Sequence, residues 1–434
     1  MELVQIQFPQ NQYLYQRKCL NPASGLADCY AVMKLYYMLA LCIITALFAM
    51  SLLAGASPVH GDYEKIHAFL DAMQSPKNCT GIDYVWSDMG CGGGFAAHFQ
   101  LAAAEWMRAA AITQYRMPVL IIGSIRKYSE GQECKHVGGD WTCFFMPVSR
   151  CQEELKRSGK QVQIDLRRLT TFDDNIIPLQ FRHVGIAYWW GLVQERMFRL
   201  QPIVRQYIID EASAMNSGKG FPGVTPESLE PEWLLKNGVE WGRAKFPLAG
   251  LHVRHGDKHN DGFKHHSMES ELRALQASPQ CAAAPNSTTV TESSGNCWVQ
   301  TVHGSMHPLP VYVASDNADV LSAAARMGHL TVGRGVSQAS SSAGMFAMLH
   351  NKPEMGYNAS LEIIRDVLFL SRCSTLVGIS ASQIFRMAVG ISNATGTLVS
   401  ATAMDYAQIP RVAQMSAKYF LPLVEFFSRP PAAK

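Results

Sequence analysis

The second half of this sequence alternates short apolar runs with longer stretches whose apolar residues recur at helical spacing. Short apolar runs predict buried strands, and the longer stretches predict helices. The predicted strands are 246–253, 310–314, 330–332 and 375–379, and the predicted helices are 316–327, 361–370 and 381–391. Strands that alternate with helices predict a parallel, doubly wound sheet, so the expected fold class is α/β.

The first half contains a glycine-rich turn at 88–94, directly before an alanine-rich stretch at 95–112 that favours a helix. Glycines at a helix start let backbone N–H groups approach a phosphate, so this turn is a candidate phosphate contact. The alternative is an ordinary helix-entry loop with Cys91 in a disulfide. A long amphipathic helix is predicted from Ala187 onward, broken or kinked near Pro202.

A dense polar cluster, His252-Val-Arg254-His255-Gly-Asp257-Lys258, leaves the first predicted strand of the second half. Such a cluster costs free energy beside a buried strand unless its groups are paired or bind a ligand. The guanidinium of Arg254 presents a planar fork of donors that matches a phosphate. The alternative is an internal ion pair, such as Arg254 with Asp257.

Polar residues also follow the next two strands, as Ser315-Asp316-Asn317 and Ser380-Ala-Ser382-Gln383. Asp316 is placed to cap the helix that follows it. The second group begins a helix, where phosphate binds readily. The Arg254 guanidinium, the Asp316 carboxylate and an anion-binding turn are thus expected at the carboxyl ends of neighbouring strands. Together they predict a nucleotide diphosphate site.

An uncharged apolar run from Leu35 to Ala54 is about as long as a helix that crosses a bilayer. Basic residues precede it and acidic residues follow it, so the positive-inside rule places the N-terminus in the cytosol. We therefore expect a cytosolic tail at 1–34 and a transmembrane signal-anchor at 35–56. The alternative is a cleaved signal peptide that begins at Met33.

Two further patterns favour a lumenal body. Four sequons are candidate glycosylation sites, at Asn78, Asn286, Asn358 and Asn393. Eight cysteines follow the apolar run and form an even set suited to disulfides: Cys79, Cys91, Cys134, Cys143, Cys151, Cys281, Cys297 and Cys373. A Ser/Thr/Ala-rich surface insertion is bracketed by Cys281 and Cys297, which could join to each other. The formal net charge of +3 gives no electrostatic case for nucleic-acid binding.

Three ordered segments resemble the peptide motifs of the α1,6-fucosyltransferase family, which includes animal core-fucosylating enzymes and rhizobial Nod-factor enzymes. They are HVRHGDK at 252–258, VYVASDN at 311–317 and the block at 360–391. The resemblance implies a GT-B fold with two Rossmann-like domains. It also implies an enzyme that uses GDP-fucose as donor without a metal and inverts the configuration at the anomeric centre. The expected acceptor-side domain is 57–245, the GDP-sugar-binding domain is 246–410 and a C-terminal tail is 411–434.

Carried over by position, the resemblance implies that Arg254 binds the β-phosphate and offsets charge on the GDP leaving group. It implies that the His252 backbone and the Asp366 side chain read guanine, and that Ser382 and Gln383 hold the diphosphate. Further donor-side positions are His255 and Gly92. Lys258, Asp316 and Asn317 fall where the family contacts the acceptor sugar, and Lys258 is also a catalytic candidate.

The sequence departs from the family pattern at several of these positions. His255 stands in place of the second arginine, and Asn317 in place of the second residue of an Asp-Asp pair. The glutamate expected as base falls at Gly262, so Asp261 is the candidate base and Glu269 a more distant substitute.

The resulting expectation is a single-pass type II Golgi membrane enzyme that moves L-fucose from GDP-fucose to a GlcNAc-containing glycan. The leading acceptor is the core GlcNAc of N-glycans, in α1,6 linkage. The alternatives are an α1,2, α1,3 or O-linked fucosyltransferase, and a catalytically degenerate lectin-like GT-B protein.

Overall fold

The computed structural model divides the chain into two units, Met1–Pro58 and Val59–Lys434. It describes residues 60–80, 82–87, 94–112, 119–123, 125, 128–129, 132–137, 139–158, 160–161, 176–216, 249–255, 266–278, 298–300, 306–308, 311–327, 330–333, 353–408 and 427–428. All of these belong to the second unit, so the predicted tail and membrane segment at 1–56 lie outside the described residues. Among the helices that are described, none is both long and apolar enough to span a bilayer.

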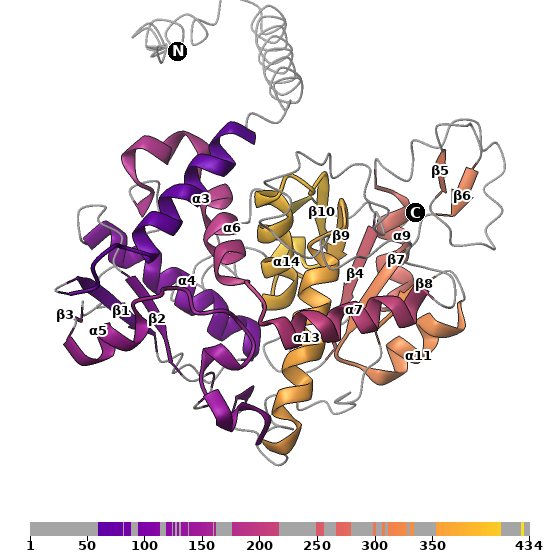
Figure 1. The fold of residues 1–434 in the computed structure, drawn as a ribbon. Helices are drawn as coiled ribbons and strands as arrows, with labels where there is room; N and C mark the ends of the chain where they lie inside the picture. The colour runs from indigo at the N-terminus through magenta and orange to yellow at the C-terminus, as the bar shows by residue number, and fades with distance from the viewer. Residues whose placement is uncertain are drawn as a thin grey trace, which may run out of the picture. The chain divides into compact units, whose positions relative to one another are not determined.

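The larger sheet of the second unit has six parallel strands (Figure 1). Across the sheet these are β11 (Phe427–Ser428), β10 (Ser400–Ala403), β9 (Thr375–Gly378), β4 (Ala249–Val253), β7 (Val311–Ser315) and β8 (Leu330–Val332). In chain order, the first strand of this sheet is β4, and β7 and β8 follow on one side of it. The chain then returns to the other side of β4, where β9, β10 and β11 follow in turn. The predicted doubly wound parallel sheet is confirmed. Its topological switch point, where ligands bind in such sheets, lies between β4 and β9.

Helices cover both faces of this sheet. They are α9 (Met268–Gln276) and α11 (Ala318–Arg326) on one face, and α13 (Gly356–Leu370) and α14 (Gln383–Ala394) on the other. Side chains alternate along β7, because successive residues of a strand point to opposite faces. Val311 and Val313 share a core with α9 and α11, whereas Tyr312 and Ala314 join the core of α13 and α14.

A second, three-stranded parallel sheet has the order β2 (Val119–Ile122), β1 (Asp83–Ser87) and β3 (Lys160–Gln161). The helices of this part are α3 (His60–Gln74), α4 (Phe95–Ile112), α5 (Gln152–Ser158), α6 (Ile186–Met197) and α7 (Pro202–Asn216). The predicted helix at 95–112 and the predicted break at Pro202 are confirmed, and Pro202 becomes the first residue of α7. An antiparallel pair joins β5 (Trp298–Gln300) to β6 (Met306–Pro308).

Helix α6 packs against α14, so segments far apart in the sequence share one core (Figure 1). The helices approach most closely at Gly191 and Gly390. A Cβ atom at Gly191 would lie 2.1 Å from the carbonyl oxygen of Gly390, so this crossing has no room for a side chain. Trp189 and Trp190 beside it are fully buried. One hydrophobic core cluster contains buried residues from Tyr63 of α3 to Ala403 of β10.

Two disulfides join Cys79 to Cys151 and Cys134 to Cys143. The expectation that Cys373 also pairs is wrong, because its thiol is free and buried under α13 and β9. Its Sγ instead approaches the carbonyl oxygen of Phe369 at 3.4 Å. Cys91, Cys281 and Cys297 lie outside the described residues.

Candidate functional site

The candidate site lies at the carboxyl edge of the six-stranded sheet. Arg254 follows β4, Asp316 follows β7 and Ser382 follows β9. Because β4 lies between β7 and β9, the sheet brings all three residues to one edge. This edge contains the switch point between β4 and β9.

Arg254 is held by Asp316 across the ends of β4 and β7. Its Nη1 forms a hydrogen-bonded ion pair with Oδ2 of Asp316, and the two side chains are 16% and 7% exposed. The backbone N–H of His255 donates to Oδ1 of the same carboxylate at 2.9 Å. A guanidinium has five N–H donors, so it can bind one carboxylate and a phosphate together. The partner that orients Arg254 is therefore Asp316, whereas Asp257 lies outside the described residues.

His252 lies near the end of β4, in register with Gly378 of β9. Its ring is 2% exposed and stacks on Phe385 of α14. Burial, with the nearby charge of Arg254, lowers its pKa to about 4, so the imidazole is neutral near pH 7. Its Nε2 lies 3.5 Å from the Ser382 hydroxyl, and Nδ1 has no partner among the described residues. A neutral, buried ring can orient neighbouring groups without adding charge.

The turn that follows β9 leads into α14 and is fixed by Asp405. The Ser380 N–H donates to Oδ1 of Asp405 at 2.6 Å, and the Ser380 hydroxyl and the Ala381 N–H each donate to Oδ2 at 3.0 Å. Ser382 is the N-cap residue of α14 but makes no side-chain capping bond. Gln383 is the first helical residue, and its carbonyl oxygen accepts a hydrogen bond from Gln100 at 2.8 Å. The predicted anion-binding turn is therefore shortened, because two of its N–H groups already bind Asp405.

Sequence analysis missed Asp405. It follows β10, a strand whose residues Ser-Ala-Thr-Ala are too weakly apolar to predict burial. The signal that identified Arg254 and Asp316, a polar residue directly after a strand, applies to Asp405 once that strand is known.

No protein-family model and no curated protein matches this chain. Among solved structures, a NodZ alpha-1,6-fucosyltransferase soaked with GDP-fucose is similar at 15% identity and a TM-score of 0.41, over 76% of this chain and 96% of its own. Fucosyltransferase NodZ from Bradyrhizobium is similar at 15% identity and a TM-score of 0.35, over 71% of this chain and 92% of its own. This likeness is distant.

Asp366 lies on α13 in a network of polar and charged side chains. Its Oδ1 accepts from the Tyr312 hydroxyl at 2.6 Å and from Nη2 of Arg365 at 2.8 Å. Burial raises the pKa of Asp366, although the charge of Arg365 opposes that rise. Glu211 of α7 pairs with the same guanidinium at 3.3 Å. Oδ2 has no hydrogen-bond partner in the described part of the chain, so a guanine contact there stays a prediction.

The residues predicted to contact the acceptor have protein partners in this structure. Asp316 binds Arg254, and Asn317 caps α11 by accepting from the Asp319 N–H at 2.8 Å. The expectation that Asp316 caps this helix is wrong, because its carboxylate is turned toward the end of β4. Their roles toward an acceptor stay predictions. Lys258, Asp261 and Gly92 lie outside the described residues.

Two predicted glycosylation sites are exposed: Asn78 in the loop after α3 and Asn358 in the first turn of α13. Asn393 is half-buried in the last turn of α14, and Asn286 lies outside the described residues. No group of three or more histidines, cysteines or acids that could hold a metal occurs within the described ranges.

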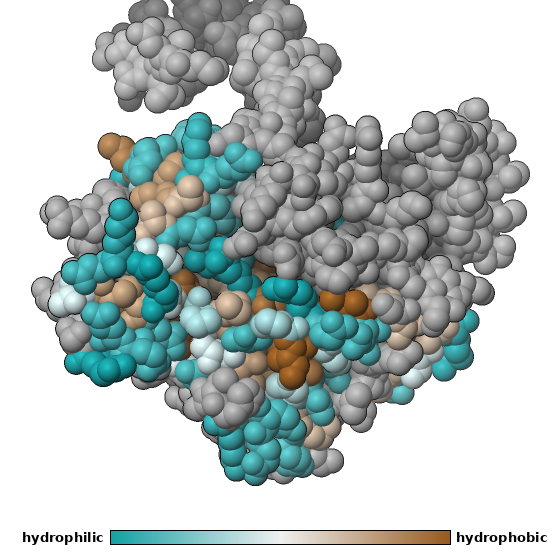
Figure 2. Space-filling model, in the orientation of Figure 1, coloured by the Kyte–Doolittle hydropathy of each residue, from teal (hydrophilic) through white to brown (hydrophobic). Residues whose placement is uncertain are grey.

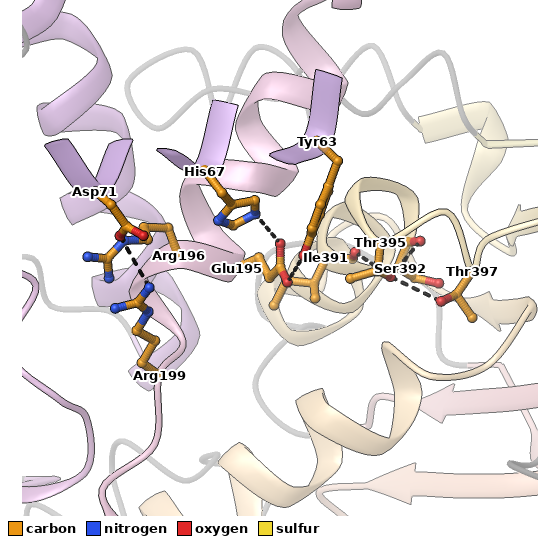
Figure 3. Close-up of polar contacts among 10 residues, drawn as sticks. All are labelled: Tyr63, His67, Asp71, Glu195, Arg196, Arg199, Ile391, Ser392, Thr395 and Thr397. Atoms are coloured by element: carbon orange, nitrogen blue, oxygen red, sulfur yellow. Dashed lines mark hydrogen bonds and ion pairs between the residues drawn. The ribbon is translucent and has the colours of Figure 1, made fainter. Parts of the chain in front are cut away.

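A second polar cluster, unforeseen in the sequence, is buried where α3 meets α6 (Figure 3). Glu195 of α6 accepts a hydrogen bond from the Tyr63 hydroxyl, and its Oε2 lies 2.9 Å from Nε2 of His67. Burial alone would raise the pKa of Glu195, but His67, Tyr63 and the nearby Arg372 together lower it. No motif marks this cluster, because its members come from three distant segments.

Proposed function

We propose that this protein is a glycosyltransferase that moves L-fucose from GDP-fucose to a GlcNAc-containing glycan. The observation that carries the proposal is Arg254 at the switch point of a doubly wound sheet, opposite the start of α14. This is where such sheets bind nucleotides. The resemblance of segments 252–258, 311–317 and 360–391 to the α1,6-fucosyltransferase motifs supports guanine and fucose as the particular donor.

In the proposed mechanism, Arg254 binds the β-phosphate and offsets the negative charge that develops on GDP as the glycosidic bond breaks. Asp316 holds the guanidinium in place, and the start of α14 supplies N–H groups to the diphosphate. The chain has no Asp-x-Asp motif, so we propose that the guanidinium takes the role that a divalent cation has in other glycosyltransferases. The acceptor hydroxyl attacks the fucosyl carbon from the opposite face, with Asp261 as the proposed base, and the configuration inverts.

We further propose a GT-B arrangement and α1,6 transfer to the core GlcNAc of N-glycans. The proposed location is the Golgi lumen, behind a retained membrane anchor. Two disulfides and two exposed sequons support an oxidising, glycosylating compartment.

A donor screen tests the proposal directly. Thermal unfolding is measured with GDP-, UDP- and CMP-sugars, because a ligand that binds the native state raises the melting temperature. We expect stabilisation by GDP and GDP-fucose alone, followed by fucose transfer to N-glycan acceptors and linkage analysis of the product. Absence of any GDP-dependent shift would reject the proposal. Glycan binding without transfer would instead favour the lectin-like alternative.

A further inference from the structure

The Asp405 carboxylate lies behind the turn that begins α14. It follows β10, which pairs in parallel with β9, so it lies beside the residues that follow β9. The Met404 N–H donates to the Gly378 carbonyl oxygen at 2.8 Å and sets this register. Asp405 is 4% exposed. Its three hydrogen bonds to the turn are therefore shielded from water and hold the backbone firmly.

These bonds determine which N–H groups can face a ligand. Ser380 and Ala381 donate to Asp405, and Ser382 donates to the Ile379 carbonyl oxygen at 3.0 Å. The N–H groups that remain for a ligand are those of the first turn of α14, which begins at Gln383 and has no side-chain cap. The buried His252 ring lies beside this start, with Nε2 3.5 Å from the Ser382 hydroxyl and Nδ1 unpartnered among the described residues.

The charge of Asp405 is balanced inside the same cluster. Burial lowers the pKa of Arg386, in the first turn of α14, only to about 10, because Asp405 favours its charged form. Burial and the charge of Asp405 raise the pKa of Glu271 on α9 well above its ordinary value, which favours the neutral form of Glu271. The guanidinium of Arg386 therefore opposes the charge of Asp405 within this cluster.

We propose that Asp405 is a positioning residue for the nucleotide diphosphate: by fixing the Ser380–Ala381 turn, it aims the start of α14 at the phosphates. The inference rests on the proposed function. Asp405 acts through the backbone and does not contact the ligand. Its loss should therefore weaken binding of the diphosphate group and leave binding of the nucleoside unchanged.

Three variants test this. Asp405→Asn keeps the shape of the side chain, but its amide NH₂ cannot accept from the turn. Ser380→Ala removes only the hydroxyl bond, and Asp319→Asn, an exposed acid on α11, is the matched control. Dissociation constants for GDP and guanosine are measured by calorimetry or NMR titration. We expect GDP to bind about tenfold more weakly to Asp405→Asn and about threefold more weakly to Ser380→Ala. Guanosine affinity should change by less than about twofold in every variant, and Asp319→Asn should match the parent.

The outcomes separate this inference from the proposed function. Suppose that the parent binds GDP, and that Asp405→Asn lowers the affinities for GDP and guanosine equally or changes neither. The positioning role is then rejected and the proposed function stands. If the parent binds neither ligand, both fail. If Asp405→Asn does not fold, Ser380→Ala decides, and an unchanged GDP affinity in that variant rejects the role.

Discussion

At the scale of single residues, Arg254 and Asp316 form the pair on which the proposed chemistry depends. Arg254→Ala should remove about 3 kcal/mol of transition-state stabilisation, which lowers kcat/KM roughly a hundredfold or more. The same change removes the guanidinium that pairs with the Asp316 carboxylate, which is 7% exposed, so stability should also fall. Adding Asp316→Asn should restore stability but not turnover, as urea unfolding and fucose-transfer assays would show. Recovery of turnover in the double variant would contradict the catalytic assignment.

Glu271 gives a prediction about pH. Its pKa is raised by burial and by Asp405, so the folded state keeps a proton that the unfolded chain loses above its ordinary pKa of 4.5. Stability is therefore lost as pH rises. Glu271→Gln removes this loss, so the free energy of unfolding of the variant relative to that of the parent should increase as pH rises above 4.5, as measured by urea unfolding. Glu269→Gln, exposed on the same helix, should show no such trend.

Sequence reasoning identified single residues better than it identified their partners. It placed Arg254 and Ser382 at strand ends, because apolar runs reveal where strands end. It could not choose Asp316 over Asp257 as the partner of Arg254, since Asp316 is 62 positions away and only the pairing of β4 with β7 joins them. Glu195 and Tyr63, 132 positions apart, carry no local signal at all.

At the scale of elements, the crossing of α6 and α14 depends on glycine. Gly191→Ala would place a Cβ atom 2.1 Å from the Gly390 carbonyl oxygen, so the helices must separate, at a cost of about 2 kcal/mol. Gly390→Ala is the matched control, because its nearest neighbour is the Gln194 side chain at 3.4 Å. Higher helix propensity should leave that variant within about 1 kcal/mol of the parent. Equal destabilisation in urea unfolding would contradict this packing.

The cluster that joins α3 to α6 should make stability depend on acid (Figure 3). The pKa of Glu195 is lowered in the folded state, so its contribution is present above the ordinary glutamate pKa and is lost as pH falls through the folded value. Glu195→Gln should cost about 3 kcal/mol near neutral pH and less in acid. Urea unfolding of parent and variant across pH measures the difference, and a constant difference would contradict it.

At the scale of the whole molecule, the described part of the face in Figure 2 is mostly hydrophilic, with separate hydrophobic spots.

The two disulfides add stability beyond the core. Replacing Cys79 and Cys151 with serine opens a loop with a sequence separation of 72 and should cost about 4 kcal/mol. The Cys134–Cys143 disulfide has a sequence separation of only 9, and its loss should cost about 3 kcal/mol.

Cys373 should resist thiol reagents until the protein unfolds, as mass spectrometry after alkylation would show.

The glycine contact between α6 and α14 also limits how this protein could be recombined with others. A chimera that joined 246–410 to a foreign first half would leave the apolar face of α14 without the helix that covers it. Exchange of residues 246–410 would have to carry α6 along, although Ile186–Met197 lies well upstream of that segment. The natural unit of exchange is thus discontinuous in sequence.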